Sequence, residues 1–362
     1  MIDLRIKVEP LPFTEPLVVR LRESYAADLG PDDAILMGVE GSRREYDYRG
    51  FSITLHADSS LKLDNDVMMI MPGKGSARRL IRADSAHNTL LITEQCDQLC
   101  VMCSQPPKKQ HVDLFEELET AASLAPRNAY IGLSGGEPLL HKRKLFDMLM
   151  MLSRVRPDLK FHILSNGQHF EEEDVELLQE IGAARILWGI PLYAPTAVAH
   201  DALVKKDGAF DRLLESFAIL FEAGSSIELR TVVMRQNYPV LPELASFVGI
   251  HLPFVERWAL MQLENIGFGR MNWDTSFKDT SAEFENVARA VDIAAAKDLA
   301  IQLYNFPHCS MPERYRHLAP AAISDWKNKF ESFCKDCSSR QSCGGFFEWY
   351  NHSRGFKGLG PI

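Results

Sequence analysis

Three cysteines, Cys96, Cys100 and Cys103, stand within eight residues of one another. They follow the apolar run 90–93, which is typical of a buried strand. Three thiolates in one short loop can bind a metal centre, but they cannot complete a four-ligand site. Structural zinc would need a fourth Cys or His close by, and the next candidate, His111, lies beyond a pair of prolines. The spacing therefore favours a [4Fe–4S] cluster bound at three irons, whose fourth iron is free for a ligand that is not protein.

The remaining four of the seven cysteines lie near the C-terminus: Cys309, Cys334, Cys337 and Cys343. Four thiolates can complete either a tetrahedral zinc site or a fully ligated iron–sulfur cluster, so both interpretations stay open. A disulfide framework would need an even, dispersed set in a secreted chain. Three cysteines for one site and four for another use every thiol, which predicts a reducing compartment, the cytoplasm.

A second motif, Gly135, Gly136, Glu137 and Pro138, follows another apolar run. Paired glycines allow a backbone to approach a ligand closely, and a carboxylate beside them can accept a hydrogen bond from an ammonium group. Alone the motif would be an ordinary turn. The motif follows an expected strand and comes after the cysteine loop in the sequence, and this position favours a ligand site.

Two weaker signals follow in the chain. Ser165 and Asn166 offer a hydroxyl and an amide at an expected strand end, although Ser-Asn-Gly is also common turn chemistry. Arg230 can bind a ligand carboxylate bidentately, and it can equally pair with a neighbouring acid.

The Cys-x3-Cys-x2-Cys loop resembles the signature of the radical S-adenosylmethionine (radical SAM) superfamily, in which the open iron binds the amino and carboxylate groups of SAM. The resemblance implies that the Gly-Gly-Glu-Pro motif holds the amino group, that Ser165 and Asn166 contact the ribose and that Arg230 binds the carboxylate. Adenine would lie near Met261. Members usually carry an aromatic residue before the third cysteine; Met102 stands there instead, and a thioether can still lie against a purine.

The C-terminal cysteines resemble the auxiliary-cluster extensions of peptide-modifying radical SAM enzymes, called SPASM and twitch domains. Four cysteines imply the twitch-like form with one auxiliary [4Fe–4S] cluster, and zinc remains the competing interpretation. Over its whole length the chain resembles the HxsC family of radical SAM maturases from the His-Xaa-Ser system. The segments 87–108 and 323–328 carry that resemblance.

This resemblance implies an enzyme that cleaves SAM to a 5′-deoxyadenosyl radical and modifies a ribosomally made peptide of the His-Xaa-Ser repeat type. A sister radical SAM maturase and an electron donor of the flavodoxin or ferredoxin type are the implied partners. The catalytic acid or base is not identified; Tyr193, His200 and Glu264 are the candidates. Two alternatives remain: a radical SAM enzyme acting on RNA or a small molecule, and a non-catalytic zinc or redox protein.

The chain's charge argues against a polyanionic substrate. Its net charge is −9 and its pI is about 5.7, whereas a generic nucleic-acid binder would more often be basic. No apolar segment follows the N-terminal residues 1–7 and no run of eighteen apolar residues exists, so we expect neither a signal peptide nor a membrane span.

Alternating elements must position these motifs. Between residues 86 and 305 we expect strands at 89–93, 130–133, 161–164, 184–190, 227–233 and 257–263. Helices are expected at 112–124, 142–155, 171–181, 211–222, 242–247 and 282–297. Six strand–helix units predict an α/β fold with a parallel sheet, in the form of a partial (β/α)6 TIM-like barrel. In such sheets ligands bind at the carboxyl ends of the strands.

Two flanking domains complete the expected organisation. Residues 1–85 read as a small β-rich domain with strands at 4–8, 34–38, 46–55 and 66–71, bounded by turn residues. Within it, the segment 73–79 reads as a solvated basic turn. Residues 306–362 form the expected auxiliary-cluster domain, the twitch-like extension.

Overall fold

The computed structural model describes residues 4–23 and 29–362. Its central element is a seven-stranded sheet in which each strand pairs in parallel with the next one along the chain. The strands are β8 (Asn88–Thr93), β9 (Tyr130–Gly135), β10 (Lys160–Leu164), β11 (Ile186–Pro191), β12 (Ser226–Val233), β13 (Arg257–Gln262) and β14 (Ile301–Tyr304). All carboxyl ends of these strands therefore meet along one edge.

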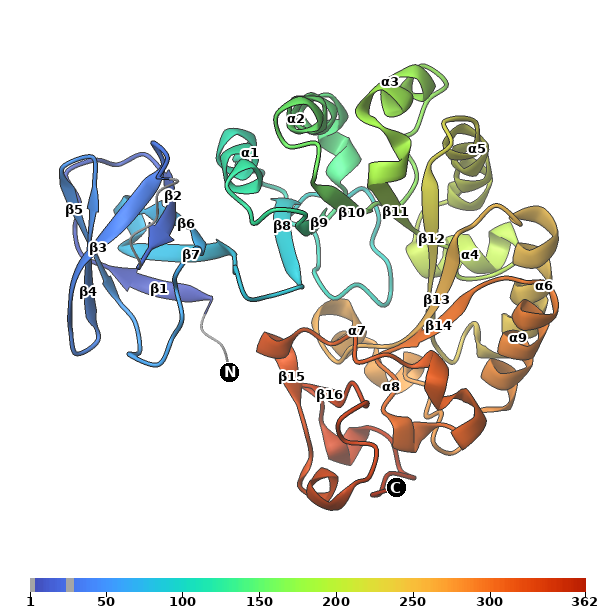
Figure 1. The fold of residues 1–362 in the computed structure, drawn as a ribbon. Helices are drawn as coiled ribbons and strands as arrows, with labels where there is room; N and C mark the ends of the chain where they lie inside the picture. Colours follow the sequence, from blue (N-terminus) through green and yellow to red (C-terminus); the bar gives the residue numbers. More distant parts are fainter. Residues whose placement is uncertain (1–3, 24–28) are drawn as a thin grey trace.

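Helices cover one side of this sheet (Figure 1). They are α1 (Phe115–Ser123), α2 (Lys142–Val155), α3 (Asp174–Ile181), α5 (Ala209–Glu222), α6 (Leu241–His251) and α9 (Glu285–Ala296). In α2 the apolar residues Leu145, Leu149 and Leu152 recur at helical spacing and are buried against the sheet. The same core contains Ile131 and Phe161 from the strands. The apolar faces of the helices and of the sheet therefore pack together in one layer.

The six predicted strands are confirmed, but the sheet has a seventh, β14. This strand has only four residues and carries Gln302 inside an otherwise apolar sequence, too short a pattern to stand out. Helix α4 (Ala197–Val204) was also missed, because its sequence is apolar nearly all round and lacks a clear polar face. Two further short helices, α7 (Gly267–Met271) and α8 (Trp273–Ser276), follow β13.

The N-terminal region forms a closed seven-stranded β-barrel. Its strands are β1 (Arg5–Val8), β2 (Leu17–Arg22), β3 (Asp33–Glu40), β4 (Arg43–Tyr48), β5 (Phe51–His56), β6 (Val67–Met71) and β7 (Ser76–Ile81). The β-rich prediction is confirmed, but β2 was not among the expected strands, and two other expectations are corrected. The expected strand 46–55 is divided by a tight turn at Arg49 and Gly50, both at positive φ. The expected basic turn 73–79 is wrong in its second half, because β7 begins at Ser76 and Arg79 is buried.

The C-terminal region consists of short 3₁₀ turns and one two-stranded ribbon, β15 (Asn328–Lys329) with β16 (Phe346–Phe347). It packs on the carboxyl-end side of the sheet through a separate apolar cluster. That cluster joins Phe346 and Cys334 of this region to Met102 and Tyr193 of the sheet domain. Among the described residues, none of the helices has the length and apolar composition needed to cross a membrane.

Candidate active site

A pocket of about 270 Å³ lies where the parallel strands end, and it gathers most of the sequence-predicted site residues. From those predictions it is lined by Cys96, Cys100, Met102, Cys103, Gly135, Gly136, Ser165, Asn166, Tyr193, Arg230, Met261 and Glu264. Glu137, Pro138 and His200 are buried and lie outside its lining. Motifs that are up to 168 residues apart in the chain thus face one cavity.

The cysteine loop is held by its backbone against helix α4. The N–H groups of Leu99 and Val101 donate to the carbonyl oxygens of Val204 and Leu203 at 3.2 and 2.9 Å. These carbonyls belong to the last turn of α4, whose terminal carbonyls have no partner within the helix. The helix that the sequence did not predict therefore fixes the loop that carries the three thiols.

A second contact holds the end of the loop. The carbonyl oxygen of Cys103 accepts a hydrogen bond from the N–H of Phe268 at 2.8 Å, at the start of α7. Gly267, at φ +58°, makes this approach possible, because a Cβ there would lie 2.6 Å from that same oxygen. The amide of Asn272 also donates to the carbonyl of Val101 at 3.0 Å.

Asp97, between the first two cysteines, is a hub of polar contacts that sequence analysis missed. Its carboxylate accepts hydrogen bonds from the Asn166 amide at 2.7 Å and from Lys206, and His169 Nε2 lies 3.2 Å from it. Burial alone would raise the pKa of Asp97, but these three donors hold it well below its usual range. No local pattern announces this hub, because its partners come from the β10 loop and the α4–α5 loop.

The Gly-Gly-Glu motif is bound to the start of the cysteine loop. The N–H groups of Gly136 and Glu137 donate to the carbonyls of Thr93 and Gln95 at 2.8 and 2.7 Å. A Cβ on Gly135 would lie 2.0 Å from the Thr93 oxygen, and one on Gly136 would lie 2.0 Å from the Gln95 oxygen. Both glycines are thus required by backbone packing between two site loops, independently of any ligand.

The Glu137 carboxylate is fully buried and already satisfied. It accepts hydrogen bonds from Leu139 N–H at 2.9 Å, Ser165 Oγ at 2.9 Å and Asn166 N–H at 2.5 Å. Burial raises the pKa of this carboxyl, while the donors act against the shift. In this arrangement Glu137 connects the β9 loop to the β10 loop.

Arg230 lines the pocket and is also engaged with the protein. One terminal nitrogen donates to Glu228, and the other lies 3.1 Å from the sulfur of Met261. The salt bridge to a neighbouring acid, one of the two alternatives for Arg230, is therefore present. Glu228 is buried on the sheet face away from the helices, with His162 Nε2 at 3.3 Å from its carboxylate. Burial would raise the pKa of Glu228, but His162 and Arg230 lower it to about 2.

The depressed pKa predicts a pH-dependent stability contribution from Glu228. Since the folded-state pKa lies below the unfolded value, the contribution is present above about pH 4.5 and is lost as the pH falls toward 2. Glu228→Gln should lower the free energy of unfolding by about 3 kcal/mol at pH 7, and by clearly less at pH 3. Thermal unfolding of iron-free protein at both pH values measures this. Exposed Glu256→Gln is the control and should change little; an equal loss at pH 7 and pH 3 would contradict the assignment.

The three catalytic candidates have different surroundings. Tyr193 lines the pocket, and burial raises the pKa of its hydroxyl. His200 lies behind it: its Nδ1 accepts the Tyr193 N–H at 3.3 Å, and burial lowers the pKa of His200 to about 4. Glu264 lines the pocket, and its carboxylate lies 3.9 Å from Lys327 Nζ. Burial raises the pKa of Glu264. Glu264 therefore combines a raised pKa with a place in the pocket lining, as is common for catalytic acids and bases.

The thiols of the cysteine loop suit a metal centre by their chemistry. Burial raises the pKa of Cys96 to about 11 and that of Cys100 to about 12, so binding as thiolates requires a positive centre that displaces their protons. Within the described residues no group of three or more His, Cys, Asp or Glu could hold a single metal ion. A cubane cluster differs from that case, because each cysteine binds a different iron.

The four C-terminal cysteines form a second group. Cys334 is buried in the apolar cluster that also contains Phe346, and Cys309 packs against this cluster. Burial raises the pKa of Cys309 to about 11, with further contributions from Cys343 and Cys334. The sulfur of Cys343 accepts N–H groups of His308 and Gly345, both at 3.4 Å. Backbone N–H donors stabilise a metal-bound thiolate, and this holds for zinc as well as for an iron–sulfur cluster.

Comparison with known proteins agrees with this geometry. Residues 90–248 match the family model described as the Radical SAM superfamily. The PqqA peptide cyclase of Granulibacter bethesdensis is 22% identical over 248 residues, covering 66% of this chain and 62% of that protein. The sporulation killing factor maturation protein SkfB of Bacillus subtilis is 23% identical over 272 residues, covering 74% of this chain and 58% of that protein.

Among solved structures, Streptococcus suis SuiB bound to S-adenosylmethionine superposes with a TM-score of 0.51 at 17% identity, covering 64% of this chain and 53% of SuiB. This likeness concerns the fold. The chain spans less than two thirds of the length of these relatives. Residues 90–248, which contain the cysteine loop and the Gly-Gly-Glu motif, are thus similar to the Radical SAM superfamily.

Proposed function

We propose that this protein is a radical SAM enzyme that modifies a ribosomally made peptide. The observation that carries the proposal is the convergence of Cys96, Cys100 and Cys103 on one pocket with Gly135 and Arg230. The donor set fits a [4Fe–4S] cluster with one open iron, and the superfamily uses such a cluster together with SAM. A peptide substrate is supported by two relatives that are named as a peptide cyclase and as a maturation protein.

When bound and reduced, the cluster and SAM supply a 5′-deoxyadenosyl radical that abstracts a hydrogen atom from the substrate. The protein's part is to hold the donor and acceptor carbons close and to exclude water. Gly135 and Gly136 would present a side-chain-free backbone to the SAM methionine moiety, and Arg230 would attract its carboxylate. Met102 and Met261 would flank adenine with polarizable sulfur.

The hydrogen-bonded motifs would together support bound SAM. Asn166 uses its amide on Asp97, and Ser165 uses its hydroxyl on Glu137, while both residues still line the pocket. Their roles toward the ribose would then depend on remaining lone pairs and backbone groups. Glu137 would act indirectly by holding both loops in place, and Pro138 follows it at the start of a buried turn.

We also propose an auxiliary [4Fe–4S] cluster on Cys309, Cys334, Cys337 and Cys343. Four protein ligands would leave it no open iron, so it would take part in electron transfer rather than bind substrate. The N–H groups of His308 and Gly345 would stabilise the Cys343 thiolate. An external electron donor of the flavodoxin or ferredoxin type would supply the reducing equivalents.

Co-expression with a peptide of the His-Xaa-Ser repeat type tests the substrate assignment. Tandem mass spectrometry is expected to show a mass change on the peptide that disappears with a Cys100→Ala variant. An unmodified peptide from a co-expression in which SAM is still cleaved would reject this peptide class. Iron and sulfide analysis after anaerobic purification tests the cluster assignment separately, since zinc at the C-terminal site would overturn the auxiliary cluster.

A further inference from the structure

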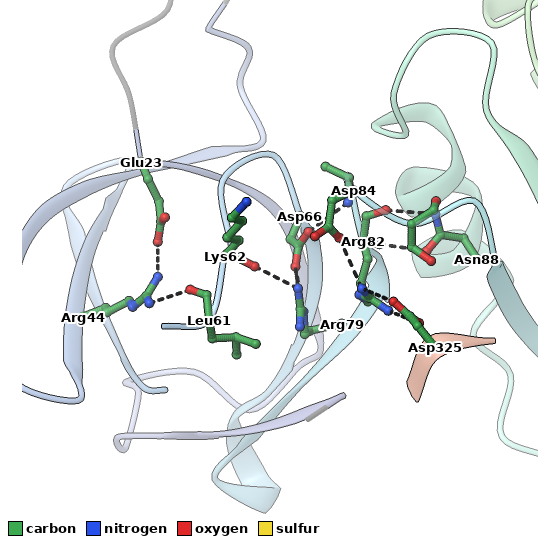
Figure 2. A network of polar contacts seen from close by, with 12 residues as sticks. Glu23, Arg44, Leu61, Lys62, Asp66, Arg79, Arg82, Asp84, Asn88 and Asp325 are labelled. Atoms are coloured by element: carbon green, nitrogen blue, oxygen red, sulfur yellow. Dashed lines mark hydrogen bonds and ion pairs between the residues drawn. The ribbon is translucent and has the colours of Figure 1, made fainter. Parts of the chain in front are cut away.

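An ion pair connects the N-terminal barrel side of the molecule to the C-terminal region (Figure 2). Arg82, directly after β7, donates to both carboxylate oxygens of Asp325, at 2.7 and 2.9 Å. The two residues are 243 positions apart in the chain. The Arg82 side chain is 7% exposed, whereas that of Asp325 is 49% exposed. The contact is thus a bidentate pair with one buried member, and bidentate geometry is the case in which an ion pair near the surface can stabilise a protein.

Arg82 is held rigidly on the barrel side. Its N–H donates to Asn88 Oδ1 at 2.9 Å, and the Asn88 amide returns a hydrogen bond to the Arg82 carbonyl at 3.0 Å. The next residue, Ala83, donates its N–H to Asp66 at 2.9 Å, and Asp66 pairs with buried Arg79 of β7. Figure 2 shows these contacts as one continuous network that ends on Asp325.

Asp325 in turn belongs to the segment whose Lys327 lies beside a residue that lines the pocket. Two residues further on, Lys327 donates its N–H to the Ser324 carbonyl at 3.0 Å and accepts the Glu348 N–H at 2.8 Å. Its Nζ lies 3.9 Å from the carboxylate of Glu264, which lines the pocket. The same Nζ lies 5.0 Å from the Phe347 ring centroid, so the lysine is bracketed by an acid and an aromatic face.

We propose that the Arg82–Asp325 pair is a clasp through which the N-terminal barrel holds residues 324–329 in place, so that Lys327 stays beside Glu264 at the edge of the pocket. Arg82 and Asp325 are therefore positioning residues. The consequence for the reaction rests on the proposed function: a loosened segment weakens substrate binding at the pocket, while SAM cleavage itself continues.

Asp325→Asn is the first test, because it keeps the side chain's shape and removes the charge. Asp84→Asn is a matched control: its carboxylate also contacts Arg82, at 3.3 Å, but it is exposed and carries no part of the segment. Hydrogen exchange of the purified full chain is expected to rise about tenfold in residues 324–329 for Asp325→Asn, and to stay at the wild-type level for Asp84→Asn. Arg82→Gln should give the same rise, and the double variant no further rise.

The second measurement is the steady-state kinetics of the enzyme with its peptide substrate. Asp325→Asn should raise the KM for the peptide about tenfold with little change in the 5′-deoxyadenosine formed without peptide, and Asp325→Glu should restore part of the loss. Wild-type exchange in residues 324–329 of Asp325→Asn, or additive effects in the double variant, overturns the clasp. If Arg82→Gln unfolds globally, Arg82→Lys replaces it, because it keeps the charge and loses the bidentate geometry. If no peptide is ever modified, the proposed function fails, and the exchange data still decide the clasp.

Discussion

Cys100→Ala should abolish 5′-deoxyadenosine formation, reducing it to the level of a protein-free control. Cys100 is the middle of the three cysteines in the loop and lines the pocket. Two remaining thiolates cannot hold a cubane that also keeps one iron open, so the variant should bring no SAM to a reducing centre. The measurement is chromatography of anaerobic reactions that contain SAM and a chemical reductant.

Leu99→Ala is the matched control for that experiment. Leu99 stands in the same loop, is 56% exposed, and contributes its backbone N–H rather than its side chain to the contact with α4. The control should retain SAM cleavage within about twofold, because a surface substitution costs little. Undiminished 5′-deoxyadenosine in Cys100→Ala would remove the three-cysteine site from the account.

Asp97→Asn should destabilise the cysteine loop most among substitutions that leave the cysteines intact. The change removes the charge that pairs with Lys206 and His169, so a partly buried ammonium loses its partner. We expect a loss of about 2 kcal/mol in the free energy of unfolding and faster release of iron from the reconstituted protein. Thermal unfolding and the rate of iron transfer to a chelator measure the two effects.

Asp207→Asn provides the comparison for Asp97. Asp207 is exposed, is adjacent to Lys206 in sequence, and loses the same charge on substitution. Its stability and its iron release should stay at wild-type values. Equal behaviour of the two variants would show that net charge near Lys206, rather than the hub on Asp97, accounts for any change.

Strand positions in the sheet domain were predictable because parallel strands buried under helices have strong apolar runs. The pocket could be placed for the same reason, since each polar motif follows one of these runs. β14 was not predicted because four residues are too few to show a clear strand period. α4 was not predicted because an apolar helix without a polar face shows no clear helical period. Yet α4 supplies the carbonyls that hold the cysteine loop.

The contacts that the motifs make with one another could not be predicted from the sequence. Gly135 and Gly136 suggested a ligand, but the structure shows that neighbouring backbone already requires them to be glycine. Glu137 suggested an ammonium partner, and its carboxylate lies buried among protein donors. In each case the residue type and its neighbours in the sequence identified the correct residue. The groups that contact it belong to another loop, which only the folded sheet brings close.

The N-terminal region gives a similar lesson about basic residues. Arg79 looked like part of a solvated turn because two arginines and a lysine stand together. In the barrel it is buried against Asp66, and the strand period of β7 decides this. A charged residue is placed inside only where its counter-ion is also present, and that pairing is tertiary.

The most direct test of the central claim is the electron paramagnetic resonance spectrum of the reduced, reconstituted protein with and without SAM. We expect a [4Fe–4S] signal that changes when SAM is added, and we expect Cys100→Ala to lose this response. Protein that binds no iron after reconstitution, or a signal that is the same with and without SAM, would contradict the claim that Cys96, Cys100 and Cys103 leave an iron open to SAM.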